Sequence, residues 1–82
     1  MAQVVLTNEL ANQFAGGETK LEVPAENVRQ LIRALEERYP GMGPELEAGM
    51  AVAIDGEIFA DPFLEPIGPD SEVYFLPRIG GG

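Results

Sequence analysis

The segment from residue 27 to residue 39 carries the clearest periodic pattern in the chain and most constrains its fold. Its apolar side chains recur at helical spacing and share one face: Val28, Leu31, Ile32, Leu35 and Tyr39. Asn27 can cap the first turn by accepting the Gln30 backbone N–H, while the Gln30 side chain returns to the cap. Pro40-Gly41 ends the helix, because the residue before a proline is pushed out of the α region. One amphipathic helix needs another layer against which to bury its stripe.

Two strand-like runs precede this helix. Residues 3–7 are rich in β-branched side chains, and residues 20–23 alternate polar with apolar. Residues 14–17 between them (FAGG) suit a turn, so an opening hairpin is expected. After the helix, residues 41–49 read as a loop, in which residues 45–48 could close a single helical turn.

The second half of the chain predicts further strands. Residues 50–59 read as two short strands around Asp55-Gly56, a dipeptide that suits a type I′ hairpin turn. Prolines interrupt the next stretch and predict a loop to about Asp70. Residues 71–76 (SEVYFL) form the strongest strand candidate, with Val73 and Phe75 on one face.

Strands on both sides of one main helix predict an α+β fold, in which the helix covers one face of a mixed sheet of four to five strands. The first and last strands are the most apolar and are expected side by side in its centre. The polar side chains of the helix are expected to face solvent: Arg29, Arg33, Glu36 and Glu37. The expected core is Val4, Leu6, Leu21, Val23, Val28, Leu31, Ile32, Leu35, Val52, Ile54, Val73 and Phe75.

Composition narrows the classes of function. The chain has 82 residues and a net charge of −9, which indicates one domain, over residues 1–77, and argues against nucleic acid or an anionic membrane as a partner. It contains neither cysteine nor histidine, which excludes thiolate nucleophiles, imidazole bases and the usual zinc ligands. The N-terminal residues show no secretory signal, so a cytoplasmic location is expected.

The chain finishes on Gly80, Gly81 and Gly82. Glycine lets a backbone pass through a gap too narrow for a Cβ, so residues 78–82 are expected to form a flexible tail with a terminal carboxylate. Five residues can reach roughly 17 Å at about 3.4 Å each. Such a tail could enter the active site of another protein; the alternative is a frayed terminus.

The last twelve residues, Ser71 to Gly82 (SEVYFLPRIGGG), resemble the C-terminal signature of the MoaD/ThiS family of β-grasp, ubiquitin-like sulfur carriers. Within this family the segment is most similar to MoaD, the small subunit of molybdopterin synthase. Residues 27–32 are also similar to the helix of that family, and residues 37–41 (ERYPG) are similar to the segment in which that helix ends. Arg78 stands where a second proline is usual, and Gly80 stands where Ser, Thr or Ala is common.

The resemblance implies a carrier rather than an enzyme. The Gly82 carboxylate would be adenylated by an E1-like enzyme of the MoeB/ThiF kind and then converted to a thiocarboxylate. Gly80 and Gly81 would allow passage through a narrow channel into the large subunit of a synthase, MoaE-like, or into another sulfur acceptor enzyme. No cofactor is expected on the chain, since the activating partner uses the ATP. The sulfur could end in a pterin, as for molybdopterin, or in a thiazole, a cysteine or a tRNA base.

Partner binding is expected on the last strand and the start of the tail. Tyr74 and Leu76 alternate away from the expected core face, and the resemblance places Leu76 at an apolar position that contacts partners. Arg78 and Ile79 continue this strand toward the glycines and are assigned to the same contact. The alternative is that Tyr74 and Leu76 lie under a loop.

Other functions remain open at this point. An acyl carrier of similar length and charge would need a serine that opens a helix, and the only serine, Ser71, precedes a strand. Asp61 with Glu65 could form an acid–base pair or a divalent-metal site, although further ligands are lacking. A β-grasp binding module with an inert tail, a ThiS-like carrier and a ubiquitin-like protein modifier are the remaining alternatives. The chain alone is expected to be a monomer.

Overall fold

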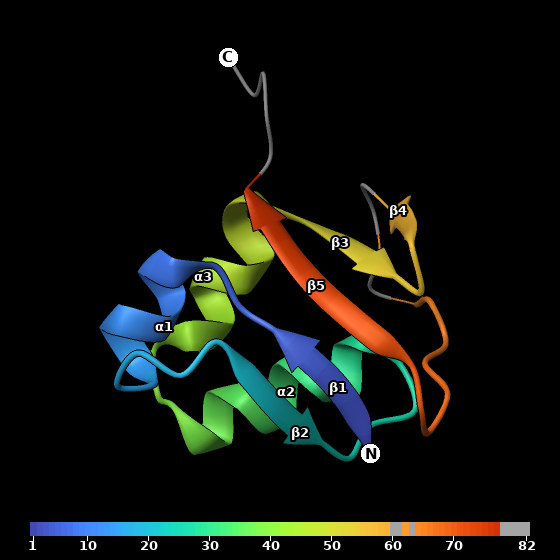
Figure 1. Cartoon of the computed structure of the whole chain (residues 1–82), viewed down its shortest axis with the longest axis horizontal. Coiled ribbons are helices and arrows are strands. Elements are labelled where there is room, and N and C mark those ends of the chain that lie inside the picture. Colours follow the sequence, from blue (N-terminus) through green and yellow to red (C-terminus); the bar gives the residue numbers. More distant parts are fainter. Residues whose placement is uncertain (60–61, 63, 78–82) are drawn as a thin grey trace.

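The chain folds into one mixed sheet with helices packed on one side. The computed structural model describes residues 1–59, 62 and 64–77. Within them the elements follow in this order: β1 (Ala2–Val5), α1 (Asn8–Phe14), β2 (Lys20–Val23), α2 (Val28–Arg38), α3 (Met42–Gly49), β3 (Met50–Ile54), β4 (Glu57–Phe59) and β5 (Glu72–Pro77). The sheet order is β2-β1-β5-β3-β4. The first and last strands are neighbours, as expected; they run parallel, and the other neighbouring pairs are antiparallel (Figure 1).

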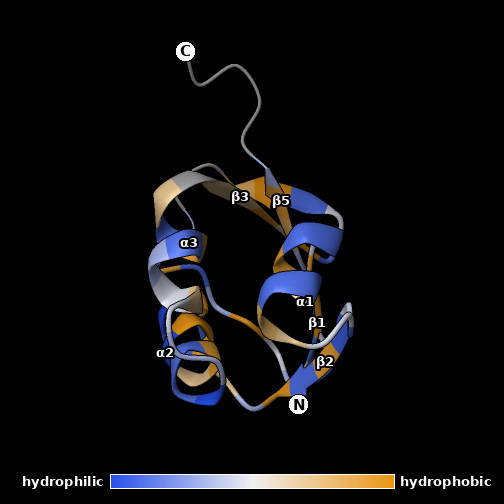
Figure 2. Cartoon of the chain, turned by 90° about the vertical axis from the view of Figure 1, so that its left-hand side faces the viewer, coloured by the Kyte–Doolittle hydropathy of each residue, from blue (hydrophilic) through white to orange (hydrophobic). Residues whose placement is uncertain are grey.

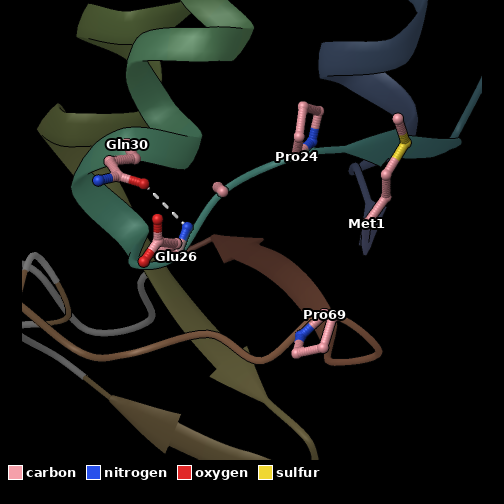
Figure 3. A pocket seen from close by; sticks show the side chains of 6 residues that line it. Met1, Pro24, Glu26, Gln30 and Pro69 are labelled. Atoms are coloured by element: carbon pink, nitrogen blue, oxygen red, sulfur yellow. Dashed lines mark hydrogen bonds between the residues drawn. The ribbon is translucent and has the colours of Figure 1, made fainter.

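The main helix, α2, begins at the predicted cap. The Asn27 side chain accepts the Gln30 backbone N–H at 2.8 Å. The Gln30 side chain accepts the backbone N–H of Glu26 at 2.9 Å, one residue before the expected partner (Figure 3). The predicted return bond to the cap is therefore wrong by one residue. The helix ends at Arg38, and Tyr39 leaves the α region with ψ at 86°.

The predicted core is confirmed residue by residue, because all twelve side chains are buried. Figure 2 shows α2 and α3 on one side of the sheet, so the helix stripe and the inner face of the sheet enclose this core. Burial of each large aliphatic or aromatic side chain contributes about 1.5–3 kcal/mol. The structure adds core residues that the sequence pattern missed: Ala2, Leu10, Ala11, Met42, Leu46 and Ile67.

The opening hairpin is correct in its strand pairing but wrong in its connection. β1 and β2 are antiparallel, yet seven residues between them form the helix α1. The Thr7 hydroxyl oxygen caps this helix by accepting the Leu10 N–H at 3.2 Å. Leu10 and Ala11 are buried, so packing against the core stabilises a helix that is too short to be stable alone. Gly16 and Gly17, with φ of 63° and 91°, return the chain to β2.

The expected loop at residues 41–49 is instead the helix α3, and Glu36 is the reason. Its carboxylate accepts the backbone N–H of Gly41 at 2.9 Å and that of Gly43 at 2.7 Å. A carboxylate is favourable at a helix N-terminus, and here it replaces the missing side-chain cap of Gly41. The expectation that Glu36 only faces solvent is therefore wrong. A Cβ at residue 43 would lie 2.8 Å from the carboxylate, which explains the glycine there.

The second hairpin confirms its predicted turn. Asp55 and Gly56 have φ of 49° and 89°, as a type I′ turn requires, and they join β3 to β4. The chain then passes through the expected loop region toward β5. In that region Ile67 donates its N–H to the Glu26 carbonyl at 2.9 Å and buries its side chain in the core. The loop is thereby attached to the start of α2.

Candidate functional site

The last strand, β5, divides its side chains between the core and the uncovered face of the sheet. Val73 and Phe75 are 0% and 1% exposed and face the helices. Tyr74 is 40% exposed, and Leu76 is half-buried, on the other face. The predicted alternation of these four side chains is correct, and Tyr74 is exposed rather than covered by a loop.

Strand register extends this apolar surface across the sheet. Tyr74 is paired with Ala53 on β3 and with Val5 on β1. Ala53 is in turn paired with Ile58 on β4, which is 66% exposed. Directly opposite residues of neighbouring strands share a face, so these side chains form one row. With the pair formed by Leu76 and Ala51 they define what we call the outer patch: Val5, Ala51, Ala53, Ile58, Tyr74 and Leu76.

The outer patch lies toward the end of the sheet from which β5 leaves. The next row in the opposite direction is polar and contains Glu22, Gln3 and Glu72. The Gln3 side-chain amide donates to the Glu22 carboxylate at 2.9 Å. The strand β5 ends at Pro77, and Figure 1 shows that this strand ends at the side of the sheet opposite to the N-terminus. The apolar surface is therefore continuous with the strand that leads into the tail.

The start of β5 is fixed by Asp55 in the β3–β4 turn. One carboxylate oxygen of Asp55 accepts the Glu72 N–H at 2.9 Å, and the other accepts the Ser71 hydroxyl at 3.0 Å. The Ser71 hydroxyl oxygen also accepts the Gly68 N–H at 2.8 Å. Ser71, the serine considered above as an attachment point, is thus buried in a structural network. These bonds hold the register that presents Tyr74 on the outer face.

Several predicted site residues lie outside the described part of the chain. These are Arg78, Ile79, Gly80, Gly81 and Gly82, together with Asp61 of the alternative metal pair. Among the residues that the structure does describe, no three His, Cys, Asp or Glu side chains gather as metal ligands. Within the same residues, no helix has the length and apolar character needed to cross a membrane.

The sequence pattern found the β5 part of the outer patch but missed its neighbours. Val5 follows the buried Val4, so strand alternation in β1 already indicated its outward position. Ala51, Ala53 and Ile58 could be added only by combining the turn at Asp55-Gly56 with the pairing of β3 and β5. That pairing joins segments far apart in the sequence.

Solved structures share this fold over nearly the whole chain. A chain from the crystal structure of the Amycolatopsis orientalis BexX/CysO complex is 21% identical, with 100% of both chains covered and a TM-score of 0.85. Mycobacterium tuberculosis CysO, described as an antigen, is 18% identical, with 96% of this chain and 100% of that chain covered and a TM-score of 0.85. The small archaeal modifier protein 1 from Methanosarcina acetivorans is 20% identical, with 99% and 95% covered and a TM-score of 0.79.

These likenesses establish the fold as the β-grasp, the class of ubiquitin-like proteins, and confirm the predicted fold class. The expected main helix is α2, and the described residues add two shorter helices, α1 and α3. Residues 4–82 match the ThiS family, and the chain belongs to that family. The predicted membership of the MoaD/ThiS group is thus confirmed, and the protein is a ubiquitin-like sulfur carrier or modifier by family. No curated protein matches the chain.

Proposed function

We propose that this protein carries sulfur as a thiocarboxylate on Gly82, after an E1-like enzyme has adenylated the terminal carboxylate. The observation that supports this most is the outer patch, an apolar surface in which Ile58 and Tyr74 are exposed and which includes the strand that leads into the glycine tail. Exposed apolar patches next to a reactive segment are typical of docking surfaces. Membership of the ThiS family supports the same chemistry.

The proposed reaction has two steps, and both take place in partner enzymes. The carboxylate oxygen first attacks the α-phosphorus of ATP, which releases pyrophosphate and leaves an acyl-adenylate. Sulfide, or the equivalent sulfur of a donor protein, then attacks the acyl carbon and displaces AMP. The chain itself supplies a carboxylate and a docking face, so it acts as a cosubstrate. A chain without cysteine or histidine suits that role.

Within this function we propose the large subunit of a molybdopterin-synthase-like enzyme as the sulfur acceptor, on the similarity of residues 71–82 to MoaD. Protein modification is the second candidate. The fold likeness to the small archaeal modifier protein 1 favours it, because that protein is described as a modifier. The two functions differ only in whether sulfur or a lysine amine attacks the adenylate.

Intact-mass spectrometry separates these possibilities. The full chain is incubated with its E1-like enzyme, ATP and a sulfide source. We expect a mass shift that corresponds to one oxygen replaced by one sulfur, located in the C-terminal peptide. An isopeptide product with lysine and no thiocarboxylate would show that the tail modifies proteins and does not transfer sulfur. If neither product forms, the tail is inert and the protein is a binding module.

The outer patch makes a separate prediction about docking. Leu76→Glu places a charge in the apolar surface, and we expect it to weaken binding of the E1-like enzyme by on the order of 2 kcal/mol, or roughly thirtyfold in Kd. Gln13→Glu is the matched control: Gln13 is exposed on α1, and its substitution adds the same negative charge outside the patch. Calorimetric titration measures both. Equal affinities for the two variants would remove the patch from the interface.

A further inference from the structure

The strand β2 lies at one edge of the sheet, and no strand of the described residues pairs with its outer side (Figure 1). The Leu6 N–H donates to the Thr19 carbonyl at 2.7 Å, one step beyond the β1–β2 register. Hydrogen-bonded pairs alternate along an antiparallel ladder, so Leu21 is also bonded to β1. Lys20 and Glu22 therefore direct their N–H and carbonyl groups away from the sheet.

This edge is only weakly protected. The Arg38 guanidinium donates to the Glu22 carbonyl at 3.5 Å, the long limit of a hydrogen bond. Beside the edge lies an open hollow of about 430 Å³ between β2 and the end of α2, and its lining includes Lys20, Glu22 and Arg38. No proline interrupts β2 itself. An unblocked edge of this kind is a template for another strand.

The sequence of the edge is complementary to itself. If two copies of β2 run antiparallel with Leu21 opposite Leu21, then Lys20 of each copy lies opposite Glu22 of the other. Lys20 and Glu22 are also the residues whose backbone groups point away from the sheet, so each of these pairs can exchange both N–H···O bonds. Their side chains share the outer face, where opposite charges directly across an antiparallel pair are stabilising. The facing charges and the positions of the outward backbone N–H and carbonyl groups thus select the same register.

We propose that β2 pairs with β2 of a second copy of this chain, in antiparallel fashion about Leu21, so that the two sheets become one. Gln3 already holds one carboxylate oxygen of Glu22 on the outer face, and the other oxygen remains available for Lys20 of the second copy. Arg38 is displaced from the Glu22 carbonyl when the strand bonds form.

The dimer is weak. The strand is four residues long, so the interface falls well below the roughly 1,600 Å² of a standard one, and each copy carries a net charge of −9. We expect a Kd on the order of 10⁻⁴ M, which leaves the dilute protein monomeric as the sequence predicted. β1 separates β2 from β5, so pairing does not cover Tyr74 or Leu76. The proposal therefore stands independently of the proposed function.

Charge exchange tests the register. Sedimentation equilibrium of the full chain, from about 10 µM to about 1 mM to span that Kd, measures self-association, and amide NMR shifts on dilution locate it. Lys20→Glu and Glu22→Lys each place like charges opposite one another, and we expect the Kd to rise about tenfold. The double variant Lys20→Glu/Glu22→Lys exchanges the two charges within each strand, so opposite charges again face one another across the pair. We expect its Kd to return to that of the unchanged chain.

Glu22→Lys is the decisive variant, because it changes the net charge from −9 to −7 and so reduces the overall repulsion between copies. If overall charge controlled association, this variant would dimerise more tightly than the unchanged chain; the proposed pairing requires the reverse. The proposal is overturned by that tighter dimer, by a chain that stays monomeric at about 1 mM, or by concentration-dependent shifts that leave the β2 amides unmoved.

Discussion

Deletion of Gly82 is expected to abolish ATP-dependent activation of this chain. The deletion leaves a carboxylate on Gly81, but the reacting group then lies about 3.4 Å short of its position in the activating enzyme. A misplacement of about 1 Å can cost about a hundredfold in rate, so we expect a loss of at least that size. Pyrophosphate release in the presence of the E1-like enzyme and ATP measures it.

The stability of the truncated chain provides the control for this experiment. Every described core residue lies at or before Phe75, so removal of Gly82 takes away none of the described core contacts. We expect thermal unfolding to be unchanged. A second variant with one alanine added after Gly82 moves the carboxylate outward instead and should be equally inactive. Normal activation of either variant would show that the position of the terminus does not matter, and the proposed carrier chemistry would fail.

The parts of the fold that were predicted correctly carry strong local signals. In α2 the cap at Asn27 and an apolar stripe over three turns agree with each other. In the second hairpin, Asp55-Gly56 determines the turn, and the turn determines the pairing of β3 with β4. In β5 the alternation of Val73, Tyr74 and Phe75 identifies the buried and exposed faces.

The two missed helices depend on interactions that are distant in the sequence. α1 buries only Leu10 and Ala11, which is too few positions for a helical period to appear, and the glycines after it favoured a turn. α3 follows a glycine cap, Gly41, with φ of 101°, and the carboxylate of Glu36, on the preceding helix, accepts the N–H groups of Gly41 and Gly43. Because Glu36 lies off the apolar stripe, its position in the sequence indicated a solvent-exposed side chain.

The part of the candidate site on β5 was predicted from the sequence, whereas its neighbours on other strands were missed, because they depend on contacts between segments far apart in the chain. Tyr74 and Leu76 could be assigned from alternation alone, since β5 is a single continuous strand. Ile58 gains its place beside them only because β3 lies between β5 and β4 in the sheet. Local pattern predicts which face a side chain takes, whereas the neighbours on that face follow from the topology.

A pair of adjacent aromatic substitutions is expected to have very different effects on stability. Phe75→Ala removes a ring that is 1% exposed, and we expect a loss of about 3–5 kcal/mol from the lost burial and the remaining cavity. Domains of this size are stable by roughly 0.05–0.15 kcal/mol per residue, so this loss approaches the whole free energy of unfolding. Tyr74→Ala removes a ring of similar size from the outer face, and we expect a loss below about 1 kcal/mol.

The comparison of these two variants tests the register of the central strand, on which both the core and the docking face depend. A shift of β5 by one residue would exchange the two faces, so Tyr74→Ala would become the destabilising change. Urea unfolding followed by circular dichroism measures both midpoints, and Phe75→Leu, which leaves a smaller cavity, keeps a measurable transition if the alanine variant is already unfolded in water. Docking should show the opposite order: Tyr74→Ala weakens binding of the E1-like enzyme, while folded Phe75→Leu retains it. If Tyr74→Ala destabilises the chain as much as Phe75→Ala does, the outer face contributes to the fold rather than to a partner, and the outer patch loses its role.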